Sequence, residues 1–231
     1  MDYKVCILAA GIGSRMLEFT KTFNKVLLPI QGKPVICHII EKFPENIGII
    51  IAVGYKKEGV IDYLKTAYPN RKFNFVNVGK YEGVGTGPGY SLLKCKEYLQ
   101  CPFIQFAGDT LVREEIPFPN KNWFGVADVK NTERFCSVKI MGDKIIRIDD
   151  KIKNDNKHAF IGLAGIKDYD IFWSALEKDK KFIAEELQVS NGFRELINKD
   201  LHSKRFTWFD TGTWEAYDYT IKNYPDGESY S

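Results

Sequence analysis

Three charged side chains stand where they could bind and polarise phosphates. Arg15 directly follows a small-residue loop that closes the first apolar run, Leu8-Ala9-Ala10-Gly11-Ile12-Gly13-Ser14. Backbone N–H groups of such a loop can approach phosphate oxygens without interference from Cβ atoms, and an arginine adds a fixed positive charge. Asp109 and Asp210 each follow an apolar run and lie close to a glycine. Such carboxylates suit Mg²⁺, which prefers a few carboxylates together with phosphate oxygens and water.

The loop differs from two common phosphate-binding classes. A dinucleotide-binding fingerprint would need its third glycine where this chain has Met16. The pattern G-x-x-x-x-G-K-[ST] of the P-loop is missing from the sequence. The loop therefore predicts phosphate binding of another kind.

Composition excludes several other classes of protein. The 33 Lys+Arg and 30 Asp+Glu leave a formal net charge of +3, too small to indicate a nucleic-acid or membrane partner. The apolar start runs directly into the glycine loop, unlike a signal peptide, and no apolar run approaches the ~20 residues of a membrane span. The 5 cysteines are scattered without a C-x-x-C pair, which argues against disulfides or a zinc site. We expect a cytoplasmic protein without nucleic-acid or membrane partners.

The elements that must position these side chains alternate regularly in the first half of the chain. Apolar strands are predicted at 5–10, 47–53, 73–78 and 103–107, and helices at 35–43, 57–68 and 87–99. Fully apolar strands alternating with helices indicate an α/β fold with a parallel sheet covered on both faces. Ligands of such sheets bind beyond the carboxyl ends of the strands, where Asp109 stands.

The pattern changes after Asp109. A strand at 123–129, a hairpin of 137–141 and 144–148 around Gly142-Asp143, and a strand at 159–166 are predicted. Helical patterns cover 171–176 and 193–197, a late strand covers 205–209, and a helix at 213–224 closes the fold. No linker divides the chain, so we expect a single domain at 1–225, with an acceptor-binding subregion at 113–200 and a flexible tail at 226–231.

Several segments together resemble the nucleotide-sugar pyrophosphorylase (NTP transferase) family. The first is L-A-A-G-x-G-S-R-M, followed from Lys25 by K-x-L-L-P-I-x-G-K-P. A Gly-Thr turn at Gly85-Thr86, the strand-end segment F-A-G-D at Asp109 and the segment W-F-D-T-G-T around Asp210 come later. The resemblance spans residues 4 to about 220. It implies a Rossmann-like, mostly parallel sheet sandwiched by helices, in a GT-A-like nucleotidyltransferase architecture with a small β-hairpin acceptor subregion.

The resemblance also implies a reaction and a role for each residue. A phosphate oxygen of a small phosphorylated acceptor would attack the α-phosphorus of an NTP, and pyrophosphate would leave. Arg15 and Lys25 would be the catalytic cations, while the loop from Leu8 to Ser14 and the Gly85-Thr86 turn would bind the nucleotide. Asp109 and Asp210 would hold Mg²⁺.

The acceptor contacts are less sharply defined. Members of the family often carry E-K-P after a hairpin, the lysine binding the acceptor phosphate. Here Lys151 follows two aspartates, the proline is missing, and Lys153 lies close by, so both lysines stay open as candidates. The same subregion offers further polar and aromatic candidates for the acceptor, Arg134, Glu186, Arg194 and Trp208.

The overall pattern is most similar to the short cytidylyltransferases of capsule-precursor synthesis, which implies CTP and a phosphoglutamine-type acceptor. A sugar-1-phosphate nucleotidyltransferase using UTP, dTTP or GTP is the first alternative. A catalytically silent nucleotide-binding regulatory subunit is the second, although such a copy need not retain Arg15, Lys25, Asp109 and Asp210 together. A glycosyltransferase would carry D-x-D where Asp109 stands alone.

Overall fold

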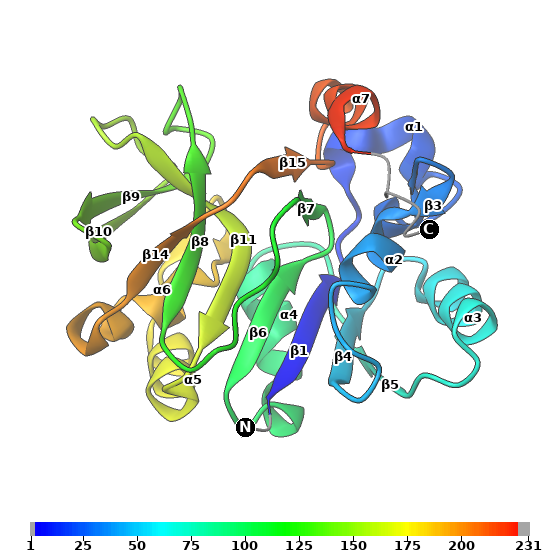
Figure 1. Ribbon diagram of the computed structural model, residues 1–231, viewed down its shortest axis with the longest axis horizontal. Helices are drawn as coiled ribbons and strands as arrows, with labels where there is room; N and C mark the ends of the chain where they lie inside the picture. Colours follow the sequence, from blue (N-terminus) through cyan, green and yellow to red (C-terminus); the bar gives the residue numbers. More distant parts are fainter. Residues whose placement is uncertain (1–2, 226–231) are drawn as a thin grey trace.

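The computed structural model describes residues 3–225, so the predicted tail at 226–231 lies outside the described residues. One mixed sheet forms the centre (Figure 1). Its strands lie in the order β5 (Phe73–Asn77), β4 (Gly48–Val53), β1 (Lys4–Ala9), β6 (Phe103–Ala107), β11 (His158–Ile166), β8 (Trp123–Asp128), β14 (His202–Arg205), β10 (Lys144–Asp150) and β9 (Cys136–Met141).

The four strands from the first half run parallel, as their apolar sequences predict. β1 pairs with β4 on one side and β6 on the other, and β4 pairs with β5. The α/β class is therefore confirmed.

Beyond β6 the sheet is mixed rather than mostly parallel. β11 runs antiparallel to both β6 and β8, and β9 and β10 form the predicted antiparallel hairpin. Only β14, next to β8, restores a parallel pair in this half of the described chain. For the β9–β10 hairpin the reason is connection length, because a parallel neighbour needs a crossover of a dozen or more residues whereas the two-residue turn at Gly142-Asp143 returns the chain directly.

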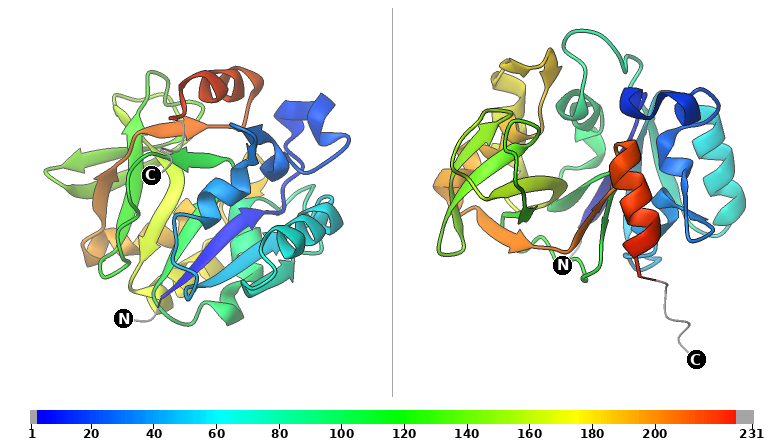
Figure 2. Two further views of the ribbon diagram at one scale, coloured as in Figure 1. Left: turned by 45° about the vertical axis from the view of Figure 1, so that its right-hand side comes forward. Right: turned by 90° about the horizontal axis from the view of Figure 1, so that it is seen from above.

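Helices cover both faces of the sheet, and the alternation of strand side chains divides the core between them. Ile49 and Ile51 of β4 face one core with α2 (Val35–Ile40) and α3 (Lys57–Ala67). Ile50 of β4 faces the other core, with α4 (Pro88–Lys94), α5 (Tyr169–Lys178) and α6 (Ser190–Phe193). Figure 2 shows these two layers of helices on either side of the sheet.

The predicted late strand at 205–209 is wrong as one element. The chain leaves the main sheet after β14 and enters a separate ladder, in which β15 (Trp208–Asp210) pairs with β7 (Thr110–Val112). Between them, the backbone N–H of Thr207 donates to the carboxylate of Glu114, at 2.9 Å from each oxygen. The Glu114 carboxylate thus accepts the Thr207 N–H that a neighbouring strand would otherwise bond.

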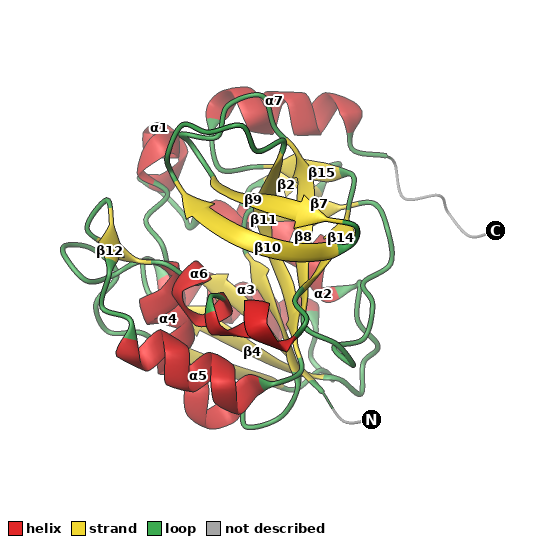
Figure 3. Cartoon of the chain, turned by 90° about the vertical axis from the view of Figure 1, so that its left-hand side faces the viewer, coloured by secondary structure: helices red, strands yellow, loops and turns green. Residues whose placement is uncertain are grey.

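Shorter elements complete the fold. The predicted helix at 87–99 is α4 followed by a 3₁₀ turn, η3 (Lys96–Tyr98). Figure 3 shows the β9–β10 hairpin lying across the end of the sheet above α6, with β12 projecting at the side. The remaining elements are η1 (Ser14–Met16), α1 (Leu17–Thr20), η2 (Lys25–Leu27), β2 (Pro29–Ile30), β3 (Lys33–Pro34), β12 (Phe182–Ile183), β13 (Glu186–Leu187), η4 (Glu195–Lys199) and α7 (Trp214–Asn223).

Within residues 3–225, none of the helices combines the length and the apolar character that crossing a bilayer demands.

Candidate active site

The β7–β15 ladder brings together the two aspartates that the sequence singles out. Asp109 stands between β6 and β7, and Asp210 ends β15, where it pairs with Thr110. Thr211 donates its backbone N–H (2.9 Å) and its hydroxyl (3.0 Å) to the Asp109 carbonyl oxygen. Figure 1 shows the chain continuing from β14 across the molecule to β15, which lies beside β7. Two segments distant in sequence therefore end at one point.

The carboxylates face a space that exists because residue 212 is glycine. A Cβ built on Gly212 would lie 3.0 Å from Asp210 Oδ1 and 3.1 Å from Asp109 Oδ2. Arg15 Nη2 would lie 3.8 Å from the same point. The Gly212 N–H itself donates to Asp210 Oδ1 at 2.8 Å. The structure thus gathers Arg15, Asp109 and Asp210 around one gap.

Lys25 also reaches this group. Its Nζ lies 2.5 Å from Asp109 Oδ2, and its stem runs alongside Gly13, whose φ is +71° and where a Cβ would come within 3.0 Å of Lys25 Cδ. All four predicted catalytic and metal-binding residues are therefore neighbours.

Asn24 positions the lysine, a role that the sequence reading missed. Its side chain caps η2 by accepting from the Val26 N–H and donates to the carbonyl oxygens of Ala9 (2.9 Å) and Tyr55 (2.7 Å). The side chain is 1% exposed and ties η2 to the ends of β1 and β4. An asparagine directly before a short helical turn is the available signal, since asparagine is a preferred N-cap.

The two carboxyl groups have opposite electrostatic environments. Burial acts to raise the pKa of Asp109, but the charges of Lys25 and Arg15 outweigh it and hold that pKa below its usual value. Burial, followed by the negative charge of Asp109, raises the pKa of Asp210 above its usual value, against the Gly212 N–H and the same two cations. A further positive charge between the carboxylates would relieve the repulsion that Asp210 experiences.

The two carboxylates fit a Mg²⁺ ion whose other ligands come from the substrate and water, rather than a metal centre whose ligands all come from the protein. The described part of the chain contains no cluster of three or more His, Cys, Asp or Glu side chains suited to a metal. Two carboxylates beside one gap are nevertheless what Mg²⁺ uses when phosphate oxygens and water supply its other ligands. Asp109 and Asp210 would hold the ion.

The predicted phosphate loop lies beside this gap. Gly108 donates its N–H to Leu8 O at 3.0 Å, and a Cβ at Gly108 would come within 2.6 Å of that oxygen, so the strand end before Asp109 packs directly on β1. Ala10 O accepts the Tyr55 N–H. A Cβ at Gly11 would meet no other described atom within 4 Å, which leaves open space in front of the loop.

The Gly85-Thr86 turn is fastened to the β12–β13 hairpin. Gly85, at φ +81°, donates its N–H to Glu185 O at 2.8 Å, and Thr86 O accepts the Leu187 N–H at 2.7 Å. The Thr86 hydroxyl donates to Gly83 O at 2.6 Å. Many polar groups of the turn therefore hold its shape, and its role in reading the base stays a prediction.

Two of the predicted acceptor residues meet. Lys151 has a φ of +50°, donates its backbone N–H to Phe135 O at 2.9 Å, and places Nζ 3.8 Å from Glu186 Oε2. Lys151 also lines an open pocket of about 440 Å³. Lys153 is exposed and does not line this pocket.

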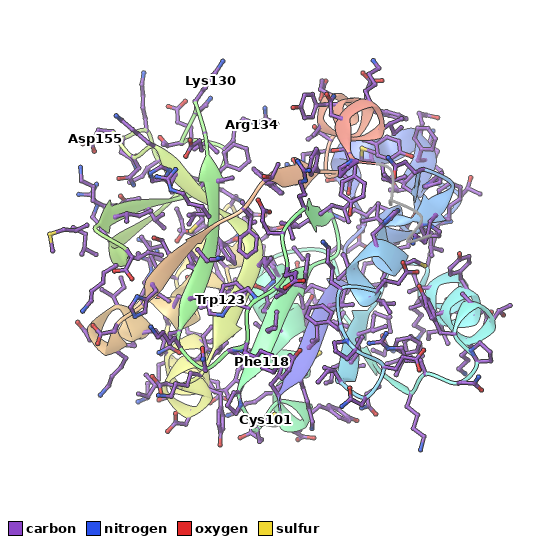
Figure 4. All side chains as sticks on the ribbon, viewed as in Figure 1. Cys101, Phe118, Trp123, Lys130, Arg134 and Asp155 are labelled. Carbon is purple, nitrogen blue, oxygen red and sulfur yellow. The ribbon has the colours of Figure 1, made fainter. Side chains whose placement is uncertain are left out.

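The remaining acceptor candidates occupy other surroundings. Arg134 lies 5.9 Å above the ring of Phe135, which meets Trp208 edge-on at 5.7 Å. Figure 4 shows Arg134 on the β8–β9 connection, on the side toward α7. Arg194 is paired with the buried Asp150 and donates to a backbone carbonyl oxygen, so it fixes the end of β10 instead of presenting a free cation.

Comparison with known proteins finds a match to one family model. Residues 5–113 match the family model described as a MobA-like NTP transferase domain. This range contains the phosphate loop, Lys25, the Gly85-Thr86 turn and Asp109.

The chain is also similar to curated proteins of methanogens. It is 31% identical over 198 residues to the bifunctional protein GlmU of Methanocaldococcus jannaschii, covering 84% of this chain and 47% of that protein. This chain spans about half the length of the curated relatives that it matches over most of its length.

Solved structures share the fold. A putative glucose-1-phosphate thymidylyltransferase from Bacillus anthracis superimposes with a TM-score of 0.79 at 22% identity and covers 98% of both chains. A UDP-glucose pyrophosphorylase complexed with UDP-glucose has a TM-score of 0.81 at 20% identity and covers 97% of this chain and 98% of its own. The fold is therefore the α/β nucleotidyltransferase fold, as expected.

Proposed function

We propose that this protein is a Mg²⁺-dependent nucleotidyltransferase that joins a nucleoside monophosphate from an NTP to a sugar 1-phosphate and releases pyrophosphate. The observation that carries the proposal is the convergence of Arg15, Lys25, Asp109 and Asp210 around the gap at Gly212. Such a reaction needs positioning and charge neutralisation more than covalent help from the protein.

Each residue has a part in an in-line displacement. An acceptor phosphate oxygen attacks the α-phosphorus, and the bond from that phosphorus to the β-phosphate oxygen breaks. Lys25 binds between the α-phosphate and the acceptor phosphate and lowers the repulsion between the two anions. Arg15 binds the departing phosphates. Asp109 and Asp210 would hold Mg²⁺, which would supply Lewis-acid polarisation of the α-phosphate.

The choice of substrates follows the relatives rather than the overall sequence pattern. A UDP-glucose complex and a glucose-1-phosphate thymidylyltransferase share the fold. These names favour the sugar-1-phosphate alternative with UTP or dTTP, and they give no support to CTP, a phosphoglutamine-type acceptor or capsule synthesis. These structures are 22% and 20% identical to this chain. The preference for a sugar 1-phosphate is therefore an argument by analogy of fold.

We place the acceptor in the 113–200 subregion of a single domain at 1–225, with Lys151 and Glu186 as its first contacts and Arg134 and Trp208 as further ones. Lys151 would bind the acceptor phosphate, and Glu186, 3.8 Å from its amine, would accept hydroxyl hydrogen bonds from the sugar. We expect the enzyme to act in the cytoplasm.

A pyrophosphate-release assay tests the proposal. Five common NTPs (CTP, UTP, dTTP, GTP and ATP) are each combined with Mg²⁺ and with one acceptor. The acceptors are glucose 1-phosphate, N-acetylglucosamine 1-phosphate, phosphocholine and phosphoglutamine. Release with UTP or dTTP and a sugar 1-phosphate, abolished in Asp109→Asn and Asp210→Asn, is the expected result. Release only with CTP and phosphoglutamine would restore the cytidylyltransferase reading. Tight NTP binding with no release from any acceptor would favour a regulatory subunit.

A further inference from the structure

Tyr81 lies between the two segments that are predicted to bind the nucleotide. It belongs to the connection from β5 to α4, four residues before Gly85. A Cβ at Gly54 would lie 3.1 Å from Tyr81 Cδ1 and 2.9 Å from Ala10 O. Because residue 54 is glycine, the ring can therefore pack close to the backbone of the first loop.

The ring is held by a fixed neighbour. Tyr55 meets Tyr81 nearly edge-on, with ring centroids 5.8 Å apart and an interplanar angle of 68°. Tyr55 is itself anchored, since its N–H donates to Ala10 O at 3.0 Å, its hydroxyl donates to Thr20 O at 2.7 Å, and its carbonyl oxygen accepts from Asn24. An anchored partner of this kind orders an aromatic ring before any ligand arrives.

Tyr81 nevertheless keeps a large free surface. It is 36% exposed, although one edge is packed against Tyr55 and Gly54. Lys80 donates from Nζ to Val84 O at 3.1 Å, which closes the segment that carries the ring. Open space lies in front of the neighbouring Gly11. The partly exposed ring therefore belongs to a residue that lies close to the first glycine loop, beside Ala10.

The Gly85-Thr86 turn offers few free polar groups to a base. Its Gly85 N–H, Thr86 carbonyl oxygen and Thr86 hydroxyl already bond within the protein. A nucleobase gains about as much from a π-face as from hydrogen bonds, and stacking tolerates any base. Tyr81 offers an aromatic surface on the side of the first loop, whereas Phe182 of β12 offers one beside Gly85.

We propose that the Tyr81 ring packs against the nucleobase of the bound NTP, between the first glycine loop and the Gly85-Thr86 turn. The inference rests on the proposed function and adds to it a residue that sets nucleotide affinity. Since the contact is made by the ring, phenylalanine can replace it. The phosphates, bound at Arg15 and the loop, do not depend on it.

Equilibrium binding separates the base contact from the phosphate contacts. Dissociation constants for the five common NTPs and for inorganic tripolyphosphate, which has no base, are measured in Mg²⁺ with the full chain. Tyr81→Ala should weaken NTP binding by roughly fivefold to a hundredfold and leave tripolyphosphate binding unchanged. Tyr81→Phe should bind both ligands as the parent does. Tyr98→Ala, which removes a 43% exposed tyrosine from η3, is the matched control and should change neither.

Other outcomes overturn the inference. Equal NTP affinity in Tyr81→Ala and the parent would show that the ring does not touch the base. An equal loss for NTP and tripolyphosphate would show that Tyr81 only shapes the loop. Failure of the proposed function gives a different result. If the parent binds NTP but releases no pyrophosphate, the proposed reaction is wrong, while the dissociation constants of parent and Tyr81→Ala can still be compared. A parent that binds none of the five NTPs overturns both.

Discussion

Thr211 holds Asp109 by two hydrogen bonds to one atom, the Asp109 carbonyl oxygen, at 2.9 Å from the backbone nitrogen and 3.0 Å from the hydroxyl. The next residue along is Gly212, whose N–H fixes Asp210. The spacing of the two carboxylates is thus set by backbone contacts between β7 and β15. This ladder acts as the positioning element of the site.

Thr211→Val should loosen this arrangement while keeping the side-chain volume. The backbone hydrogen bond remains, but the buried carbonyl oxygen loses its hydroxyl donor, which costs about 1 kcal/mol of unfolding free energy. Turnover should fall by roughly tenfold, because small displacements of catalytic groups are costly. Pyrophosphate release and thermal unfolding measure the two effects.

The control is Thr66→Val, which removes a comparable hydroxyl bond from the exposed surface of α3. It should leave turnover unchanged. Unaltered turnover in Thr211→Val would mean that the backbone bond alone positions Asp109.

The sequence singles out the charged residues of the candidate site more readily than the residues that support them. Arg15 and Asp109 are recognisable because one follows a glycine loop and the other a continuous apolar strand, features that are local in sequence, whereas Lys25 is found through the family-like segment K-x-L-L-P-I-x-G-K-P that it opens. Thr211 and Asn24 act through bonds to residues at sequence separations of 102 and 15, which no local pattern encodes.

The same limit explains the strand errors. The hairpin around Gly142 was predicted correctly because its turn residues are local. The late strand at 205–209 was wrong because an apolar run does not reveal that the chain changes partners here, with the Thr207 N–H donating to Glu114 and β15 pairing with β7. The mixed half of the sheet escaped prediction for the same reason, since strand direction depends on which neighbours meet in space.

Glu114 bonds Thr207 in the connection between β14 and β15, and this contact should make the stability of the protein sensitive to acid. Burial acts to raise the pKa of its carboxyl, but the hydroxyl and N–H of Thr207 outweigh burial and bring the pKa below the ordinary 4.5. A depressed pKa in the folded state contributes stability above pH 4.5, and that contribution is lost as the pH falls through the folded-state value. Because the carboxylate is partly exposed, the effect should be about 1 kcal/mol.

Urea unfolding at pH 7 and at pH 3 tests this contribution in Glu114→Gln. The variant should be less stable than the parent at pH 7, and the difference should shrink at pH 3. The neighbouring Glu115→Gln, at an exposed position, serves as the control and should show no such pattern. A constant difference at both values would assign the effect to packing.

Lys25 should matter for the chemical step more than for binding. Lys25→Met keeps most of the apolar stem beside Gly13 but removes the charge that we propose stabilises the transition state. Turnover should fall by roughly 10²-fold or more, as for the loss of one oxyanion-type donor. Steady-state kinetics separate kcat from KM, and a rise in KM alone would make Lys25 a binding residue. Lys21→Met, at an exposed lysine paired with Glu18, should behave as the parent.

Gly212→Ala should disrupt the proposed metal site while leaving the fold intact. The new methyl group would occupy the gap, 3.0 Å from Asp210 Oδ1 and 3.1 Å from Asp109 Oδ2, where an ion must approach both oxygens. The backbone at Gly212 lies outside the left-handed region, so alanine adds no backbone strain there. Turnover should fall at least a hundredfold at saturating NTP, and Mg²⁺ binding measured by titration calorimetry should weaken.

Gly59→Ala provides the matched change, because its Cβ would meet only Leu27 Cδ1 at 3.9 Å on the surface of α3. That variant should keep full turnover and, since alanine favours helix over glycine by about 1 kcal/mol, should be slightly more stable. If Gly212→Ala retained parental turnover and Mg²⁺ affinity, the ion could not lie between the two carboxylates. The reaction would then require a different ligand set, with Asp210 serving only to position Asp109 through the β7–β15 ladder.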